Sequence, residues 1–397
     1  MEETGTGARL ARRMRRVSAS PIMELLKTTA GGNYTSFASG LPDPELYPTA
    51  ALSGIAEEVL AEDGRMALQY GPAEGYPPLR AWIAERMRQR GLADATPEHI
   101  LITHGSQQAL DLAARVFLDT GAAVLLETPS YLAAIQAFDS YEAEYAPVPL
   151  DAEGMEVERA VALLKDHRPR LIFTLPNFQN PTGITQSLAR RQRLAELAAE
   201  YQAPLLEDDA YHDLRYEGEA LPPVTALAPN PLAIYTGTFS KTIAPGLRVG
   251  YLYAQPALVA RLAQLKQITD LHTGSFAQRL VYQFCARCLL EPQIALLRDT
   301  YRARRDALLA ALEESLSGMA SWTRPLGGMF LFVSLPSHLD AQALLPAAQE
   351  RGVLFVPGAG FHPDGGGANT LRLNFVSAHE EAIRRGTAIL AEVIAAS

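Results

Sequence analysis

The stretch 238–251, Thr-Phe-Ser-Lys-Thr-Ile-Ala-Pro-Gly-Leu-Arg-Val-Gly-Tyr, places a lysine between two apolar runs. The runs 232–236 and 249–254 read as buried strands, so Lys241 stands in the loop between them. Hydroxyl residues lie one and three positions before it, and Arg248 follows seven positions later. Partial burial and a nearby cation favour a neutral, nucleophilic amine, and hydroxyls with an arginine can hold a phosphate. The pattern predicts a lysine that condenses with an aldehyde ligand, against the alternative of a solvated surface lysine.

Lysine is rare in this chain, which narrows the search for a reactive amine. The chain has 35 basic residues, and only Lys27, Lys165, Lys241 and Lys266 are lysines, so 31 are arginines. Lys241 is the best placed of the four, with a strand before it, hydroxyls beside it and an arginine after it. We therefore take Lys241 as the candidate catalytic residue.

Length and charge limit the class of protein. A chain of 397 residues that is 48% hydrophobic can bury large cores and should divide into about two to three units of domain size. Its formal net charge of −9 argues against binding to DNA or RNA, because phosphate backbones require a basic surface. No apolar stretch approaches the ~18 residues of a membrane helix, and the N-terminus lacks the apolar region of a signal peptide. We expect a cytoplasmic protein that binds neither nucleic acid nor membrane.

The cysteines and histidines show no pattern typical of a metal site. Cys285 and Cys288 form one C-x-x-C pair, but a structural zinc site needs about four ligands and the sequence has no second pair. The segment 281–290 reads as a largely apolar helix, so two partly buried thiols are expected. The eight histidines have no ligand spacing. The sequence therefore predicts no metal.

Short apolar runs alternate with helix-like segments from about residue 50 onward, which is typical of an α/β layer structure. The runs are continuous, as in strands buried on both faces of a mainly parallel sheet. They are 99–103, 123–126, 170–175, 203–207, 232–236 and 249–254. Helical stretches between them include 107–118, 187–201 and 256–270.

The pattern changes after about residue 291, where a long Ala/Leu/Arg helix is expected to reach residue 316. Beyond it, the alternating runs 329–335 and 370–375 predict a smaller α+β unit with a half-exposed sheet. The basic cluster 9–16 reads as a solvated face of a short helix. We expect three parts: residues 1–45 join the small unit, residues 46–290 form the large domain, and residues 291–397 form the small domain.

An anion site is predicted where the strand 99–103 ends. Gly105 turns the chain into a helix, and the backbone amides at a helix N-terminus bind anions, here with side-chain donors from Ser106 and Gln107. Junctions of this kind are also common in α/β proteins without any ligand. This junction therefore supports an anion site only in combination with other features of the sequence.

A second polar site follows the strand 203–207. Asp208 falls in the crevice where open α/β sheets bind ligands. A carboxylate there can keep a pyridine nitrogen protonated, and Tyr211 can donate to a ring hydroxyl. The alternative for this segment is that an aspartate caps the N-terminus of a helix, and Asp209 is the residue we expect in that role.

Two further residues fit the same ligand. Asn180 stands before a proline in a turn after the strand 170–175, so its backbone is restricted and its amide can be aimed; an ordinary turn is the alternative. Arg372 lies inside an apolar strand, where its planar fork matches a carboxylate. A structural salt bridge is the alternative for Arg372.

The chain resembles the fold-type I, pyridoxal 5′-phosphate-dependent aminotransferases of class I and II over nearly its whole length. Within them it is most similar to the branch of 2-aminoadipate and kynurenine/aminoadipate aminotransferases. The resemblance implies an α/β transferase fold with a mainly parallel seven-stranded sheet between helices, and a smaller α+β domain. The residues that carry the resemblance are Ser39-Gly40-Leu41-Pro42, Gln69-Tyr70, Glu74-Gly75-Tyr76, Gly105-Ser106-Gln107-Gln108, Pro129-Ser130-Tyr131, Asn180-Pro181-Thr182-Gly183, Asp208, Ala210-Tyr211, Ser240-Lys241, Pro245-Gly246-Leu247-Arg248 and Arg372.

The resemblance also implies a role for each matching residue. Lys241 would carry the cofactor and move the proton of the substrate Cα. Tyr131 would stack on the ring, Asp208 would pair with the ring nitrogen, and Asn180 and Tyr211 would hold the phenolic oxygen. Phosphate binding would fall to Gly105, Ser106, Gln107, Thr238, Ser240, Arg248 and Tyr70 of the neighbouring subunit, and binding of the substrate carboxylate to Arg372, Asn180 and the backbone at Gly40. Because Tyr70 would cross an interface, the resemblance implies a homodimer with shared active sites.

Two positions depart from the family pattern. Thr238 stands where a serine is usual, which keeps the hydroxyl. Met23 occupies a stretch from which members that accept acidic side chains can offer an arginine, and Met is soft and apolar. We therefore expect donors that are similar to leucine, aromatic amino acids or 2-aminoadipate.

The expected activity is a ping-pong transfer of the amino group from a 2-amino acid to a 2-oxo acid, with 2-oxoglutarate as the acceptor. Another reaction on the same scaffold, by a β-lyase or decarboxylase, is one alternative. A regulator with an aminotransferase-like sensor domain is a second, disfavoured because about 40 residues leave no room for a winged helix. A nicotinamide-dependent enzyme is a third, but no G-x-G-x-x-G follows a strand.

Overall fold

The computed structural model describes residues 10–17, 19, 24, 25, 27 and 34–397. In this part of the chain the largest element is an eight-stranded sheet with the order β2-β9-β8-β7-β6-β3-β4-β5. Strands β4, β3, β6, β7 and β8 are parallel, whereas β9 runs antiparallel to both β8 and β2. The strands are β2 (Ile100–Thr103), β3 (Ala123–Thr128), β4 (Glu144–Asp151), β5 (Gly154–Met155), β6 (Leu171–Thr174), β7 (Leu205–Asp208), β8 (Ala233–Thr238) and β9 (Gly250–Ala254).

The count of strands exceeds the seven that the resemblance implies. The additional strand is β5, a two-residue segment that pairs antiparallel with the end of β4. It forms a short hairpin at the sheet edge and leaves the mainly parallel order of the other strands unchanged.

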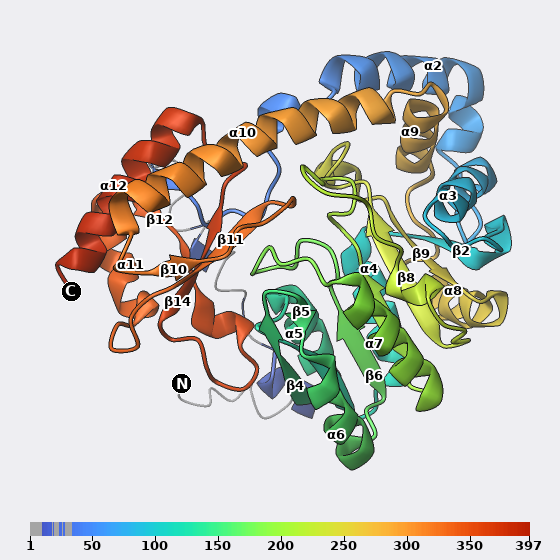
Figure 1. The fold of residues 1–397 in the computed structure, drawn as a ribbon. Helices are drawn as coiled ribbons and strands as arrows, with labels where there is room; N and C mark the ends of the chain where they lie inside the picture. Colours follow the sequence, from blue (N-terminus) through green and yellow to red (C-terminus); the bar gives the residue numbers. More distant parts are fainter. Residues whose placement is uncertain (1–9, 18, 20–23, 26, 28–33) are drawn as a thin grey trace.

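Helices cover both faces of the large sheet (Figure 1). One face packs on α4 (Ser106–Phe117), α5 (Leu132–Asp139) and α8 (Pro256–Asp270), which share an apolar core with Leu126, Phe173 and Leu206. The other face is covered in two parts, by α6 (Val157–His167) with α7 (Leu188–Glu200), and by α3 (Pro77–Gln89) with α9 (Ser275–Ala286) and α2 (Thr49–Ala67). Burial on both faces explains why the strands read as continuous apolar runs.

A smaller sheet, with the order β10-β11-β14-β13, lies beside the first one. Its strands are β10 (Ser321–Trp322), β11 (Phe330–Ser334), β13 (Val356–Pro357) and β14 (Thr370–Asn374). The helices next to it are α10 (Leu290–Leu316), α11 (Ala341–Glu350) and α12 (Glu380–Ala395). Helix α10 crosses from the large sheet to the small one along one side of the molecule (Figure 1).

The expectation of a half-exposed small sheet is wrong. All residues of β14 and the first four of β11 are buried. The core formed with α10 and α12 covers one face, and residues of the large unit meet the other, as in the contact of Tyr211 with Phe330. The alternation in the sequence thus reflects two different buried environments.

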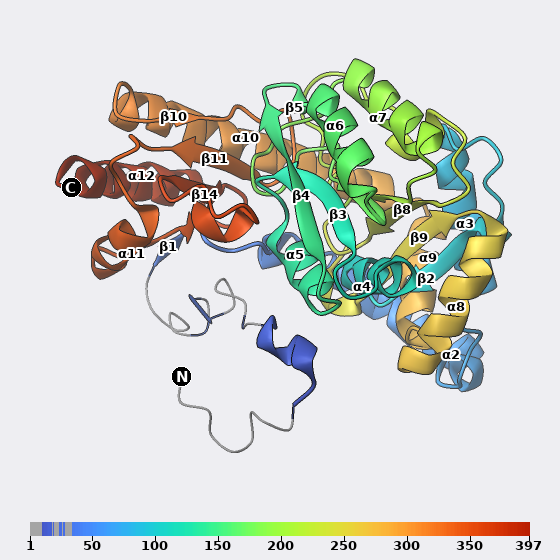
Figure 2. The same cartoon turned by 90° about the horizontal axis from the view of Figure 1, so that it is seen from below.

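The segment that begins at residue 34 joins the small sheet region. β1 (Thr35–Ser36) pairs in parallel with β12 (Val353–Leu354), and the backbone N–H of Asn374 donates to the carbonyl of Phe37. Further upstream, a short 3-10 helix, η2 (Arg12–Arg15), lies beside the large sheet and its helices (Figure 2). Arg12 forms an ion pair of 2.8 Å with Glu142 there, so the basic cluster contacts the chain's own large sheet region.

The turn after α9 departs from the sequence expectation. The apolar segment 281–290 is not one helix, because α9 ends at Ala286 and α10 begins at Leu290. Cys288 lies in the turn with a φ of 57° and is exposed, whereas Cys285 is buried in α9; both are free thiols.

Within the described residues, no helix combines the length and apolarity needed to cross a membrane. The cytoplasmic location stays a prediction.

Candidate active site

Lys241 lies in the loop that joins β8 to β9. Its Nζ donates a hydrogen bond of 3.1 Å to the carbonyl oxygen of Gly40, which comes from the N-terminal segment. Burial, and then the charge of Arg372, lowers the pKa of Lys241 to about 8, although Asp208 acts in the opposite direction. A larger fraction of the amine is therefore neutral near physiological pH than in an ordinary lysine, as a nucleophile requires.

Asp208 ends β7 and is almost fully buried. Its Oδ1 is buried without a hydrogen-bond partner, which is costly for a carboxylate unless a ligand supplies the partner. Burial, with the neighbouring charge of Asp209, raises the pKa of Asp208 to about 7. The structure therefore leaves an acceptor at this position that suits a ligand N–H.

The helix N-cap alternative for this segment is wrong, because residues 210–213 form turns and no helix starts there. Asp209 instead accepts hydrogen bonds from Asn177 and Tyr235 and pairs with His212 at 3.1 Å. These contacts hold Asp209 on the far side of the strand end. Asp208 is left as the carboxylate without a partner.

An anion cradle forms where β2 meets α4. Gly105 has a φ of 75° and precedes the first residue of α4, Ser106. A Cβ at Gly105 would come within 2.5 Å of Nη2 of Arg248, so only glycine allows this arginine to approach. Nearby, the hydroxyls of Thr238 and Ser240 lie 2.9 Å apart, and the Ser240 amide donates to Thr238 Oγ1. A guanidinium, hydroxyls and a helix N-terminus are a combination that binds phosphate.

Arg372 lies in β14 and is buried. Its Nη1 donates to Asn180 Oδ1 at 3.1 Å, its Nη2 donates to the carbonyl of Ala38 at 2.9 Å, and its guanidinium stacks on Phe330 at 4.3 Å. Burial lowers the pKa of Arg372 to about 10. Among the described residues no carboxylate pairs with it, and its Nε is buried without a partner. The salt-bridge alternative is therefore wrong, and the guanidinium can receive a ligand carboxylate.

Two tyrosines and Asn180 lie between these groups. Burial, together with the charge of Asp208, raises the pKa of Tyr131 to about 12, and burial also raises the pKa of Tyr211. Asn180 hydrogen-bonds to the Tyr211 side chain as well as to Arg372. Both phenols therefore stay protonated at neutral pH and can act as donors.

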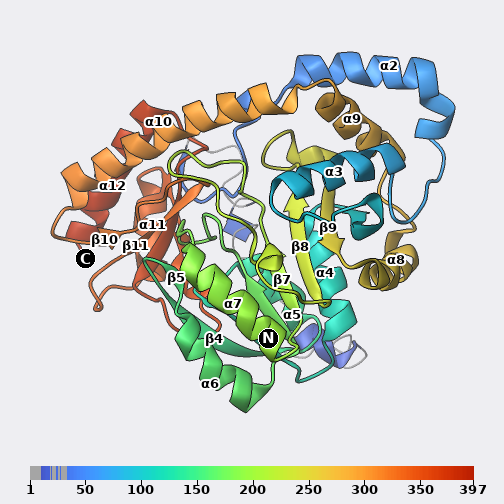
Figure 3. The same ribbon diagram turned by 45° about the vertical axis from the view of Figure 1, so that its right-hand side comes forward.

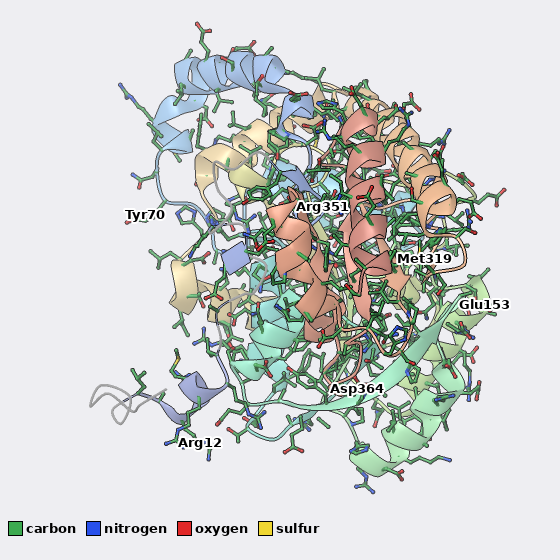
Figure 4. All side chains as sticks on the ribbon, turned by 90° about the vertical axis from the view of Figure 1, so that its left-hand side faces the viewer. Arg12, Tyr70, Glu153, Met319, Arg351 and Asp364 are labelled. Carbon is green, nitrogen blue, oxygen red and sulfur yellow. The ribbon has the colours of Figure 1, made fainter. Side chains whose placement is uncertain are left out.

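Gln107 lies at the edge of this cluster, where it lines a hollow with His104 and Arg248, whereas the structure does not place Tyr70 or Met23 in the cluster. Tyr70 is 75% exposed, projects outward (Figure 4) and touches the ring of His272 edge-on at 5.7 Å. Gln107 is exposed at the first turn of α4 and donates to the carbonyl of Ala133. Met23 lies outside the described residues.

The sequence reasoning missed a buried pair behind the site, Glu127 and Gln179. Glu127 accepts hydrogen bonds from Thr174 Oγ1, from the Leu175 amide and from Gln179 Nε2. Burial raises the pKa of Glu127 to about 7. One sequence feature could have pointed to Glu127. It is a charged residue at the end of a buried apolar run, two positions before Pro129.

Gln179 joins the two loops that carry Tyr131 and Asn180. Its Nε2 donates to the carbonyl of Pro129 at 2.7 Å, and its Oε1 accepts from the amide and the hydroxyl of Thr182. The pair thus fixes both loops against β3.

The residues present fit a phosphorylated pyridine aldehyde. The unpaired Oδ1 of Asp208 suits the protonated ring nitrogen, the cradle around Gly105 suits the phosphate, and the Lys241 amine suits the aldehyde.

Comparisons with known proteins agree with this chemistry. The model of the family described as aminotransferase class I and II matches residues 33–387. The aromatic-amino-acid aminotransferase 1 of Thermococcus litoralis is 42% identical over 383 residues, covering 95% of this chain and 92% of that protein. The 2-aminoadipate transaminase of Thermus thermophilus is 44% identical over 375 residues, covering 94% and 92%.

Solved structures show the same likeness. The α-aminoadipate aminotransferase of Thermus thermophilus, complexed with N-(5′-phosphopyridoxyl)-L-leucine, has a TM-score of 0.92 at 41% identity and covers 99% of this chain and 98% of that one. The kynurenine aminotransferase of Pyrococcus horikoshii, in complex with PMP, has a TM-score of 0.94 at 40% identity and covers 98% of each chain.

Proposed function

Since the chain belongs to the family of class I and II aminotransferases, it is a pyridoxal 5′-phosphate-dependent transaminase, and we propose that its donors are 2-amino acids with apolar, aromatic or 2-aminoadipate-like side chains. We further propose 2-oxoglutarate as the acceptor, in a ping-pong reaction. The observation that carries the assignment is the buried, unpaired Asp208 carboxylate together with the partly desolvated Lys241 amine.

When bound, pyridoxal phosphate supplies an aldehyde for the amine and a pyridinium ring that withdraws electrons from the substrate Cα. Asp208 would hold the protonated ring nitrogen, because its buried Oδ1 has no partner among the described residues. Lys241 would hold the cofactor aldehyde, and its partly neutral amine would accept and return the proton of the substrate Cα. Tyr131 and Asn180 would keep the ring in place, and Tyr211, whose side chain already contacts Asn180, would donate to the phenolic oxygen.

Arg372 binds the substrate α-carboxylate through nitrogen atoms that do not face a protein carboxylate. The carbonyl of Gly40 orients the Lys241 amine in the same space. Both contacts place the substrate Cα beside the base.

An apolar cavity of about 130 Å³ supports the proposed donor class. Its lining includes Leu25, Leu132, Val356 and Phe361, and no charged residue of the described chain lines it. Leu132 follows Tyr131, and Phe361 stacks on Arg372 at 5.3 Å. A side chain directed from the carboxylate site toward this cavity meets mainly hydrocarbon, which favours leucine-like and aromatic donors, and Gln342 is the polar side chain in the lining that could meet a longer, 2-aminoadipate-like one.

We also propose a homodimer in which Tyr70 contributes to the partner's phosphate site together with Ser106, Gln107, Thr238, Ser240 and Arg248. Residues 46–290 would form the cofactor-binding domain, and residues 1–45 with 291–397 the small domain. The exposure of Tyr70 supports the shared site.

A donor panel tests the proposal. The purified holoenzyme is assayed with 2-oxoglutarate and 2-aminoadipate, leucine, phenylalanine, tryptophan or kynurenine, and donor consumption and oxo-acid formation are measured with and without the acceptor. Glutamate is assayed with pyruvate as the acceptor, because its reaction with 2-oxoglutarate gives no net product. Turnover that requires the acceptor supports transamination, whereas multiple turnovers without it favour the β-lyase or decarboxylase alternative. A strong preference for glutamate contradicts the proposed donor class.

A further inference from the structure

A groove lies apart from the site described above and is lined by residues of α3, of the loop after β7 and of the first half of α10. The course of α3 and α10 can be followed in Figure 3. The groove consists of two adjoining hollows of about 430 Å³ and about 360 Å³. Both hollows are lined by Arg215, Ala220 and Arg298, so they form one continuous depression. Its size lies within the range of small-molecule sites, about 300 to 1,000 Å³.

Three arginines in the larger hollow have only uncharged partners. Arg215 Nη2 donates to Asn177 Oδ1 at 3.1 Å, Arg298 Nε donates to the carbonyl of Asp213 at 2.6 Å, and Arg302 donates to the carbonyl of Tyr216. In the part of the chain that the structure describes, no ion pair involves any of the three. Each guanidinium is therefore held in place while other N–H groups stay available.

The carboxylates around the groove do not balance these charges. Asp213 is engaged by Arg86 and Arg90, and Glu291 is engaged by Arg86. Asp299 is the carboxylate that lines the larger hollow with the three arginines, which leaves an excess of two positive charges there. His212 also lines the smaller hollow and pairs with Asp209.

The arginines also repel one another. Burial, followed by the charge of Arg191, lowers the pKa of Arg215, and Arg298 lowers it further. A dianion between Arg215 and Arg298 would replace this repulsion by charge-assisted hydrogen bonds.

We propose that this groove binds a small phosphate-type anion with at least two negative charges, held by Arg215, Arg298 and Arg302. Guanidinium groups from two elements can grip phosphate oxygens from two sides. The net charge of the larger hollow matches a dianion.

The groove connects to the active site through one short path. Arg215 stacks on Phe178 at 4.8 Å, and its partner Asn177 donates to Asp209, the neighbour of Asp208. Phe178 and Asn177 belong to the loop that carries Asn180. An anion that fixes Arg215 would therefore also steady this loop.

Calorimetric titration of the holoenzyme with pyrophosphate at low ionic strength tests the proposal. In the holoenzyme the cofactor phosphate occupies the cradle at Gly105, so pyrophosphate does not report on it. We expect one saturable site per chain, and sodium chloride at matched ionic strength should give no saturable heat. The double variant Arg298→Gln/Arg302→Gln should bind about tenfold more weakly or worse.

The matched control is Arg261→Gln/Arg385→Gln, which removes the same charge from exposed positions on α8 and α12. It should bind as the wild type does, and urea unfolding of both variants checks that the fold is intact. The proposal is overturned if the wild type shows no saturable binding, or if the groove variant and the control have the same affinity.

Discussion

At the residue scale, the lowered pKa of Lys241 sets the pH at which the apoenzyme captures its cofactor. Because the pKa is about 8, roughly a tenth of the amine is neutral at pH 7, far more than for an ordinary lysine. The rate of cofactor attachment should rise with pH and level off above about pH 8. For a lysine with the ordinary pKa it would level off only above pH ~10.5. Stopped-flow absorbance of apoenzyme mixed with pyridoxal phosphate measures this profile.

Arg372 provides the control for that profile. Its charge is the second cause of the lowered pKa of Lys241, after burial. Replacing it by methionine removes the charge and keeps an apolar stem, so the midpoint of the Arg372→Met variant should move to higher pH. If the attachment rate of the wild type had its midpoint near pH ~10, the pKa of Lys241 would not be lowered in the protein.

Glu127 offers a second prediction, because its hydrogen-bond chain has a fixed direction. Gln179 uses its oxygen for Thr182 and its nitrogen for Glu127 and Pro129. In the Glu127→Gln variant the new side-chain amide N–H group would face Gln179 Nε2, so two donors would meet. The Gln179 amide cannot turn over to relieve this, because its oxygen would then lose the hydrogen bonds from Thr182. We expect the Asn180 loop to shift and the KM for the amino donor to rise about tenfold, with a smaller change in kcat.

Glu207 is the matched control for Glu127. It is also a buried carboxylate at a strand end, burial raises its pKa to about 7, and it accepts from the amides of Val224 and Thr225. Glu207→Gln should cost similar stability in urea unfolding but leave KM unchanged. An equal rise of KM in both variants would reduce Glu127 to a general stabilising residue.

Sequence patterns pointed to the candidate ligand-binding residues better than to the residues that support them. Lys241 and Asp208 stand beside recognisable strand ends and turns, so their positions follow from local sequence. Glu127 and Gln179 are 52 positions apart and meet only in the fold. No local pattern encodes a contact of that kind, and the exposure of Tyr70 likewise depends on packing that the sequence does not display.

At the element scale, buried strands of four or more residues and long helices could mostly be predicted, and the two-residue strands could not. The predicted run 123–126 corresponds to β3, the predicted helix 256–270 to α8, and the long helix after residue 291 to α10. β4 was missed because it contains Pro147 and Pro149, which are typical of turns and edges, and it lies next to the edge strand β5.

The junction of β2 with α4 yields a third prediction. Gly105→Ala places a Cβ against Arg248 and forces a left-handed φ on alanine, so the guanidinium should move out of the phosphate cradle. Affinity for pyridoxal phosphate, measured by cofactor release, should fall about tenfold or more.

Gly121→Ala is the control for this change. Gly121 has a nearly identical φ of 76°, but nothing lies within 4 Å of the Cβ position. It should carry the strain of a positive φ without loss of cofactor affinity. Equal affinity of the two variants would show that the contact with Arg248 has no role in phosphate binding.

At the scale of the whole molecule, one exposed apolar surface predicts the assembly. It is made of residues from the ends of α2 and α8 and the segments that follow them, and the hydroxyl of Ser275 ties the two regions together by donating to the carbonyl of Gln69. The exposed fractions are 57% for Met66, 74% for Leu68, 75% for Tyr70, 74% for Ile268 and 51% for Leu271. Large apolar groups gathered in this way are typical of a surface that another chain covers.

We therefore expect a dimer that Leu68→Asp/Ile268→Asp converts to a monomer with little activity, because a monomer lacks the partner's Tyr70 at its phosphate cradle. Light scattering after gel filtration measures the mass, and the donor assay measures the activity. Leu188→Asp/Leu326→Asp, which changes exposed leucines elsewhere, should leave both unchanged. Activity in the monomer equal to that of the wild type would mean that each chain completes its own site, and Tyr70 would then have to act within its own chain.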